Sequence, residues 1–224
     1  MDISILTLFP EVIQNVLSSS IIGRAQKKGI LTFNIINIRN FAADKHRSVD
    51  DKPFGGGVGM IMRVDIVDKA LSQAKKIFKQ KNRNSVFHEK TVLLDPAGTI
   101  FSQSTARKYS KLDHLILICG HYEGIDYRIR NFCDETLSIG KYVLTGGEIP
   151  AMVVSDTVSR LVPGVLEKKD ATLYESYSKK NVAEYPQYTR PQVYKGLTVP
   201  DVLRSGNHKK IAEWKEKMVR KIRK

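Results

Sequence analysis

Two loops marked by glycine, each following a short predicted strand, are the segments whose residue types and spacing most favour chemistry. The first is residues 119–124 (CGHYEG) and the second is residues 145–147 (TGG). Glycine lets the backbone approach another molecule closely, so that its N–H and C=O groups can bind without side-chain charge. Glu148 and Pro150 follow the second loop, as is typical of the first turn of a helix. The pattern predicts one small-molecule pocket floored by backbone.

A third glycine cluster, GGGVG at residues 55–59, carries less information on its own. It is not a P-loop, because no Gly-Lys-Ser or Gly-Lys-Thr follows it, and it lacks the spacing of a dinucleotide-binding fingerprint. Its composition alone favours a flexible turn. Asp50 and Asp51 stand just before it, and they could either hydrogen-bond the edge of a nucleobase or cap a turn.

Five motifs together resemble one protein family. GHYEGID at residues 120–126 with SIGKYVLTGGE at residues 138–148 is similar to the cofactor loops of the bacterial tRNA (guanine-N1)-methyltransferases. These enzymes belong to the trefoil-knotted (SPOUT-class) methyltransferases, which use S-adenosylmethionine. The other four motifs occur in the family's order over nearly the whole chain, at residues 46–62, 155–166, 185–191 and 199–215. The resemblance therefore implies a methyltransferase that modifies tRNA.

The resemblance also implies where S-adenosylmethionine binds. Three loops would hold it, with Pro96 and Gly98 in the first, Gly120, Tyr122, Glu123 and Gly124 in the second, and Ser138, Ile139, Tyr142, Leu144, Gly146 and Gly147 in the third. Glu123 could face the cofactor's positive end or its ribose, or it could only be favoured at a helix N-terminus. Asp95 stands where relatives often have a neutral residue. Family members use Mg²⁺ for activity, but the sequence has no His and Cys cluster with metal-ligand spacing, so we predict no metal site.

Methylation of guanine at N1 needs a base and a group that stabilises negative charge. The nitrogen is a poor nucleophile until its proton leaves, and removing the proton pushes charge onto O6. The resemblance puts the general base in a linker, at Glu175, and the group that stabilises O6 at Arg160. Relatives commonly have Asp-Ser-Phe where this chain has Glu-Ser-Tyr, so Asp170 stays open as an alternative base. Alternatively, Glu175 is an exposed linker acid and Arg160 a surface or core-flanking arginine, and neither has a catalytic role.

The resemblance implies that the substrate is tRNA with guanine at positions 36 and 37, and that the enzyme is a homodimer. The residues predicted to bind RNA are Asp50, Gly55, Gly56, Gly57, Lys217, Lys221 and Lys224. Phe54, in the same loop as the glycines, stands where relatives often have tyrosine. Two alternatives stay open: a knotted methyltransferase with another RNA target, and an RNA-binding protein that has lost catalysis.

The composition agrees with a nucleic-acid partner. The net charge is +14, and residues 166–224 hold 15 Lys and Arg against 7 Asp and Glu, which favours a polyanionic partner. No apolar run approaches the roughly 18 residues that span a membrane, and the N-terminus lacks the basic start of a signal peptide. Cys119 and Cys133 form no CxxC motif. We expect buried free thiols and a cytoplasmic enzyme without membrane contact.

The elements that must position these residues alternate between strands and helices. Apolar runs predict strands at residues 3–9, 32–38, 91–95, 114–119 and 135–139. Helices are predicted at residues 10–27, 64–81, 103–111, 125–132 and 149–161. This alternation predicts an α/β fold with a mostly parallel sheet. The deep trefoil knot rests on the resemblance alone, because knots are nearly absent from other proteins.

The chain is predicted to form three parts. Residues 1–166 would be the knotted catalytic domain that binds S-adenosylmethionine, and residues 167–183, which are polar and without period, would be a flexible linker. Residues 184–224 would be a small α-helical, basic domain that binds tRNA. In its last helix Ile211, Trp214, Met218 and Ile222 share one face. The lysines around that face either form a solvated surface or contact phosphates.

Overall fold

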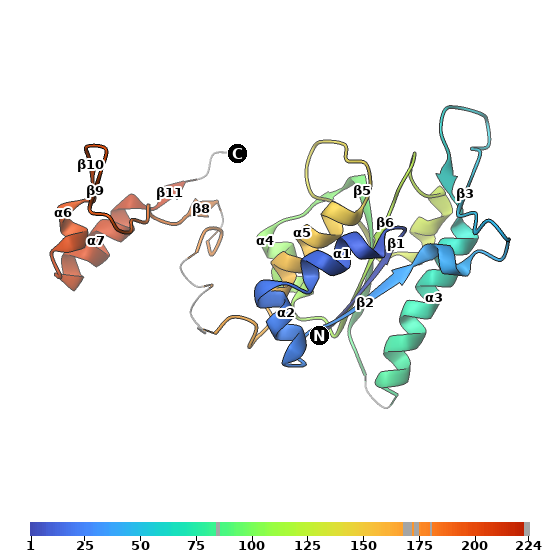
Figure 1. Cartoon of the computed structure of the whole chain (residues 1–224), viewed down its shortest axis with the longest axis horizontal. Helices are drawn as coiled ribbons and strands as arrows, with labels where there is room; N and C mark the ends of the chain where they lie inside the picture. The colour runs from blue at the N-terminus through green and yellow to red at the C-terminus, as the bar shows by residue number, and fades with distance from the viewer. Residues whose placement is uncertain (84–85, 168–171, 173–174, 180, 222–224) are drawn as a thin grey trace. The chain divides into compact units, whose positions relative to one another are not determined.

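The structure of the protein is a computed structural model that describes residues 1–83, 86–167, 172, 175–179 and 181–221. The chain divides into two compact units, Met1–Leu166 and Glu167–Lys224. The first unit contains a central sheet and its helices, and the second contains two helices and short strand pairs (Figure 1).

A five-stranded sheet forms the centre of the first unit. Its strands are β1 (Asp2–Thr7), β2 (Thr32–Asn37), β5 (Glu89–Ile100), β6 (His114–Cys119) and β7 (Glu135–Ser138). They lie in the order β2-β1-β6-β5-β7, and every pairing between neighbours is parallel. The predicted α/β class with a mostly parallel sheet is confirmed. The trefoil knot stays a prediction, because strand order does not trace how loops thread.

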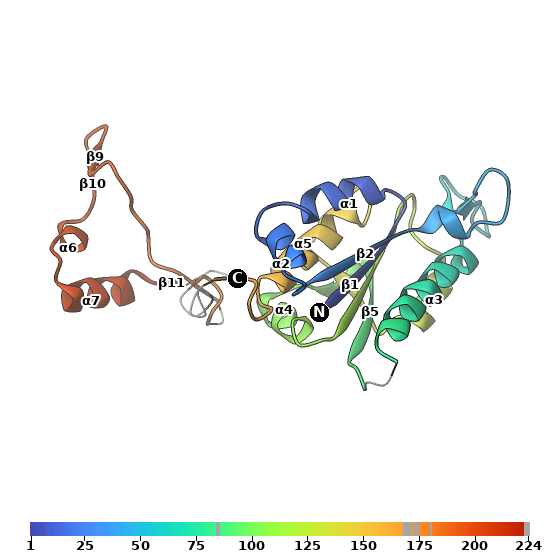
Figure 2. The ribbon, with the colours of Figure 1, turned by 60° about the horizontal axis from the view of Figure 1, so that its bottom comes forward.

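Helices cover both faces of this sheet (Figures 1 and 2). One face carries α1 (Pro10–Leu17), α2 (Ser20–Lys27), α4 (Gln103–Tyr109) and α5 (Glu148–Ser159). The other carries α3 (Val64–Lys81) with the 3-10 helices η1 (Ile38–Phe41) and η2 (Tyr127–Phe132). Strands covered on both faces are apolar throughout, and every residue of β6 is indeed buried.

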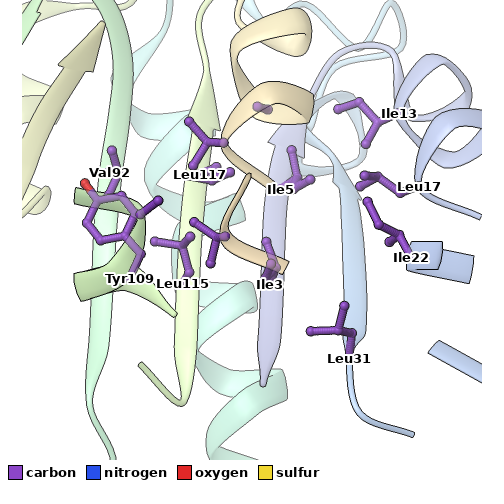
Figure 3. Close-up of a cluster of buried hydrophobic side chains, with 14 of the residues drawn as sticks. Ile3, Ile5, Ile13, Leu17, Ile22, Leu31, Val92, Tyr109, Leu115 and Leu117 are labelled. Atoms are coloured by element: carbon purple, nitrogen blue, oxygen red, sulfur yellow. The ribbon is translucent and has the colours of Figure 1, made fainter. Parts of the chain in front are cut away.

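Alternating side chains of β6 divide the core into two clusters. Leu115 and Leu117 pack on the α1 and α5 side, where Figure 3 shows them between Val92 of β5 and the isoleucines of β1. Ile116 and Ile118 pack on the α3 side. Because both clusters share one strand, the position of β6 and of the loop after it is fixed from both faces.

Two predicted helices differ in the structure. The predicted helix at residues 10–27 is two helices, since the chain turns at Ser18–Ser20 and Ser20 has a φ of 50°. Serine hydroxyls compete for backbone groups, and Ser19 Oγ donates to the Asn15 carbonyl at 2.9 Å. The predicted helix at 125–132 is instead the 3-10 helix η2. Its first turn is capped by the Asp126 carboxylate, which accepts from the Arg128 N–H.

The second unit contains α6 (Asp201–Arg204) and α7 (His208–Met218) with two short antiparallel pairs. One pair is β8 (Val182–Ala183) with β11 (Arg220–Lys221), and the other is β9 (Val193–Tyr194) with β10 (Leu197–Thr198). The predicted last helix ends at Met218, because the ψ of Val219, 132°, is not helical, and Ile222 lies outside the described residues. None of the helices in the described parts of the chain is long and apolar enough to cross a membrane.

Candidate active site

A cavity of about 330 Å³ lies beside the carboxyl ends of β6 and β7 and the middle of β5, three neighbouring strands of the sheet. Ligands of open parallel sheets usually bind at this edge. Three segments line the cavity: a bulge at residues 95–98 of β5, the loop after β6 and the loop after β7. Of the residues predicted to bind the cofactor, only Gly98 does not line the cavity. The others do: Pro96, Gly120, Tyr122, Glu123, Gly124, Ser138, Ile139, Tyr142, Leu144, Gly146 and Gly147.

The loops after β6 and β7 are pressed together at Gly147. Its N–H donates to the Gly120 carbonyl at 2.8 Å. A Cβ at this position would lie 2.5 Å from Cys119 Cα and 2.9 Å from Gly120 N, which no real side chain tolerates. The φ of Gly147 is −81°, a value open to every residue, so close approach and not backbone conformation requires glycine here. Gly147 therefore allows the loop after β7 to pack directly against the backbone of the loop after β6.

The first segment is a bulge in β5. Leu94 and Thr99 both pair with Leu137 of β7, so residues 95–98 are looped out of the strand register. Gly98 does not line the cavity but closes the base of this bulge. A Cβ on Gly98 would lie 2.5 Å from Leu137 N. The contribution of Gly98 is thus to let the bulge lie flat against β7.

The loop after β7 is shaped by its own side chains. Ser138 Oγ donates to the Gly140 carbonyl at 2.8 Å, and the Tyr142 hydroxyl donates to the Ile139 carbonyl at 3.3 Å. The Tyr142 ring occupies the space where a Cβ on Gly140 would lie. Sequence reasoning missed Gly140, although its place within the glycine-marked motif was a usable signal.

The Asp50 and glycine segment forms a hairpin tied to the second cavity loop. β3 (Asp50–Asp51) pairs with β4 (Ile61–Met62), and the glycines predicted to bind RNA lie in the turn between them at positive φ. Met62 N–H donates to the Gly124 carbonyl at 2.9 Å, and Glu123 N–H donates to the Met60 carbonyl at 3.1 Å. Two backbone hydrogen bonds therefore join the hairpin to the cavity loop.

Two carboxylates, those of Asp95 and Glu123, line the cavity, and none of its described lining residues is Lys or Arg. The aliphatic side chains of Leu93, Leu94, Leu137, Ile139 and Leu144 form apolar parts of the wall. His121 Nδ1 is buried and has no hydrogen-bond partner among the described residues. The described lining of the cavity therefore combines two carboxylates with apolar surface.

Both cysteines are free thiols, as predicted. Cys119 is buried behind the second loop, whereas Cys133 is only half-buried, so the prediction of burial is wrong for Cys133. Burial, with the charge of Glu148 as a smaller cause, raises the pKa of Cys119 well above its usual value. Burial raises the pKa of Cys133 to about 11. Neither thiol is therefore a nucleophile near neutral pH.

Neither predicted catalytic residue, Arg160 nor Glu175, is among the residues that line the cavity. Arg160 is half-buried and follows the last residue of α5, and Glu175 is half-buried at a turn in which Ser178 N–H donates to its carbonyl. These two residues belong to different units. Asp170 and Lys224 lie outside the described residues, whereas Lys217 is exposed in the last turn of α7 and Lys221 is in β11.

Comparison with known proteins identifies the family. A family model described as tRNA (Guanine-1)-methyltransferase TrmD matches residues 1–224. A tRNA (guanine-N(1)-)-methyltransferase of Carboxydothermus hydrogenoformans is 53% identical over 218 residues, which cover 97% of this chain and 82% of that protein. Proteins of the same name from Latilactobacillus sakei (46% identical over 218 residues, 97% of this chain and 85% of that protein) and Alkaliphilus oremlandii (50% over 216 residues, 96% and 86%) are also similar.

The chain belongs to the tRNA (guanine-1)-methyltransferase family. It is therefore a methyltransferase, and the family implies S-adenosylmethionine as the methyl donor. The cavity fits this donor, which carries a neutral adenine, a ribose and a cationic sulfonium. Its volume is within the range of small-molecule sites, about 300–1,000 Å³. Glu123 contributes a carboxylate to a wall whose described lining residues include no Lys or Arg, which suits a ligand with a positive end.

The sequence did not predict two features of the site in this member of the tRNA (guanine-1)-methyltransferase family. His121 lies between aromatic rings, with centroid distances of 5.0 Å to Phe9 and 4.9 Å to Tyr122. Asp95, which the sequence left unexplained, accepts a hydrogen bond from Arg130. The contacts of His121 with Phe9 and of Asp95 with Arg130 join residues far apart in the sequence, so no local pattern predicts them. Within the described residues, no three His, Cys, Asp or Glu side chains converge to hold a metal ion.

Proposed function

We propose that this enzyme transfers a methyl group from S-adenosylmethionine to N1 of guanine 37 in tRNA, next to the anticodon. The observation that carries the proposal is the cavity, with its three loops, two carboxylates and no cationic lining side chain among the described residues. The comparisons support the chemistry, because relatives at 46–53% identity are named for guanine-N1 methylation of tRNA.

The loop residues around the cavity would hold the donor. Backbone groups of the loop containing Gly140 and Gly147 can pair with adenine edges, while the Glu123 carboxylate can attract the positive end. When bound, S-adenosylmethionine supplies an electrophilic methyl group on a cationic sulfur. The apolar wall excludes water from that carbon, which favours attack by the guanine nitrogen over hydrolysis.

Glu175 and Arg160 would make the guanine nitrogen reactive. The Glu175 carboxylate would accept the N1 proton as general base. The lone pair left on N1 could then take the methyl group as the bond between this carbon and the sulfur breaks, which leaves a neutral thioether. The Arg160 guanidinium donates hydrogen bonds to O6, where negative charge develops as the proton leaves. Because Glu is one methylene longer than the Asp of relatives, the segment that carries it must sit further back from the base.

A homodimer supports this division of labour. Val12 and Val16 of α1 and Ile149 and Val153 of α5 are large apolar side chains that are exposed on two neighbouring helices. Contiguous exposed apolar residues mark contact surfaces. Arg160 directly follows α5, so a two-fold partner on this face would receive Arg160 close to its own cavity. The composite site would thus combine the cavity of one subunit with the base and arginine brought by its partner.

The substrate we propose is tRNA with guanine at positions 36 and 37. A base in an anticodon loop can splay out without melting a duplex, so its N1 edge is reachable. The unit Glu167–Lys224 carries basic residues on α7 that can contact phosphates, and the hairpin after Asp50 can meet the target base. Such an enzyme works where tRNA matures, in the cytoplasm.

The test measures donor and substrate separately. Titration calorimetry should detect S-adenosylmethionine binding to the purified protein. Unmodified tRNA with G36 and G37 should then acquire N1-methylguanine at position 37, detected by mass spectrometry after nuclease digestion. Equal methylation of tRNA with adenine at position 37 would overturn the substrate. Binding of tRNA without donor binding or methyl transfer would favour a non-catalytic RNA-binding protein.

A further inference from the structure

We propose that the ion pair between Asp95 and Arg130 is a clamp that holds the cavity loops in their binding geometry. Both would be positioning residues for the methyl donor, so the inference rests on the proposed function and deepens it. Asp95 lines the cavity within the β5 bulge, and Arg130 lies on η2, the element that follows the second loop. Arg130 Nη2 donates to Asp95 Oδ2 at 3.0 Å.

The guanidinium of Arg130 reaches a second partner in the same region. Its Nη1 donates to Thr136 Oγ1 at 3.0 Å, and Thr136 lies on β7, the strand that leads into the third loop. The donors of a guanidinium form a rigid planar fork, so satisfying both acceptors fixes the separation between the bulge and β7. The Arg130 side chain therefore links the bulge at residues 95–98 to β7, the strand that leads into the third cavity loop.

The ring of Tyr127 steadies this fork. The guanidinium carbon of Arg130 lies 4.9 Å from the ring centroid of Tyr127, which lies on the same 3-10 helix. A cation over an aromatic face is attracted by the ring's negative face. The stacking restricts the rotamers of Arg130 before any ligand arrives, so less ordering is left for binding.

Asp95 holds the bulge with its other oxygen. Ala97 N–H donates to Asp95 Oδ1 at 2.8 Å, across the turn that interrupts the β5–β7 register. One carboxylate oxygen therefore fixes the bulge and the other fixes Arg130. The side chains of Asp95 and Arg130 are 31% and 27% exposed, so water screens the pair in part and each substitution should have a moderate effect.

A neighbouring ion pair supplies a matched control. Arg128 Nη2 and Asp126 Oδ2 are 2.6 Å apart, also on the segment after the second loop. These residues are two positions apart, and Arg128 is 67% exposed, so this pair joins no distant parts of the chain. Arg128→Gln removes the same charge as Arg130→Gln without touching the bulge or β7.

The experiment is a double-mutant cycle on S-adenosylmethionine binding by titration calorimetry. Arg130→Gln and Asp95→Asn should each raise the Kd about fivefold, the upper end for a partly exposed pair. The factor by which the double variant raises the Kd should be clearly smaller than the product of the two single factors, because both substitutions remove the same ion pair. Arg130→Lys keeps the charge but not the fork, so it should recover part of the affinity. The KM for the donor should rise by the same factor while kcat at saturation stays constant.

Amide hydrogen exchange separates a clamp from general stability. In the ligand-free protein, Arg130→Gln should speed exchange at Ala97 and leave the amides of β6 unchanged. Faster exchange throughout the first unit, a Kd equal to that of Arg128→Gln, or single effects that multiply in the double variant would each overturn the clamp. Wild-type protein that does not bind S-adenosylmethionine would instead overturn the donor assignment, and the clamp's role with it.

Discussion

In the first unit, Met1–Leu166, buried side chains fill both faces of the sheet, and glycines seat the cavity loops directly on one another. Among the residues of the second unit whose side chains the structure describes, from 167 to 220, none is buried. Its aromatic packing there is Trp214 against Tyr185 and Tyr188, at ring-centroid distances of 6.4 and 6.3 Å. The described part of the second unit therefore has far less buried packing than the first unit to hold its conformation.

The difference indicates two modes of binding in one chain. A site whose loops are already packed loses little entropy when a small ligand enters, so the donor should bind the first unit tightly by itself. A unit with few buried apolar contacts has low local stability and gains order from what it binds. RNA phosphates and a second subunit are partners that could supply such contacts. Disturbing the packed loops should consequently have larger effects than disturbing the exposed basic surface.

The largest effect should come from Gly147→Val. Its Cβ would collide with Cys119 Cα, and the two loops must then part. We expect the Kd for S-adenosylmethionine to rise by more than about 100-fold, as when a fitted site loses its shape. Calorimetry measures the affinity, and circular dichroism shows that the variant is folded. Normal donor affinity in folded Gly147→Val protein would contradict the role of this loop.

Gly29→Ala is the matched control for that variant. Gly29 has a φ of 70°, and a Cβ there would have no atom within 4 Å, so alanine adds backbone strain without a collision. The strain should cost about 1–2 kcal/mol of folding free energy. Donor affinity should stay unchanged, because Gly29 precedes β2, away from the cavity lining.

Glu175→Gln should have the next largest effect. Loss of a positioned general base usually lowers the chemical step about 10²–10⁴-fold. Single-turnover methylation of tRNA measures this step, and calorimetry should show donor affinity unchanged, because Glu175 is not part of the first unit. Near-full activity of Glu175→Gln together with loss of activity in Asp170→Asn would move the base to Asp170.

The parts that the sequence predicted and those that it did not differ in their physical origin. The strands of the sheet follow from local apolar runs, and the run HLILIC sets β6 without help from distant residues. The fork from Arg130 to Asp95 and Thr136 joins residues up to 35 positions apart, and no local period records such a contact. The serine break at Ser18–Ser20 was readable in principle, because three hydroxyls in succession compete with helical hydrogen bonds.

Mixing two inactive variants should restore part of the activity if the site is shared between subunits. Arg160→Ala and Gly147→Val damage opposite halves of the proposed composite site. Random re-association after unfolding or subunit exchange would leave about a quarter of all sites intact in mixed dimers. Methylation assays on the mixture, set against each variant alone, measure this recovery. No recovery, or a monomer by light scattering at the assay concentration, would show that each chain carries a complete site.

The smallest effect should come from the basic surface of the second unit. Replacing Lys217, Lys221 and Lys224 together with glutamine should weaken tRNA binding roughly tenfold, because each lysine can neutralise one phosphate. The slope of log K against log salt should fall by up to about three, one for each of the three ammonium groups removed. Donor affinity should not change.

A triple variant on α3 is the control for this C-terminal triple variant. Replacing the exposed Lys69, Lys76 and Lys79 with glutamine removes the same net charge from the first unit. If its salt slope falls equally, overall charge and not the second unit attracts the tRNA. If only the C-terminal triple variant changes the slope, this weakly packed unit holds the RNA while the packed loops hold the donor.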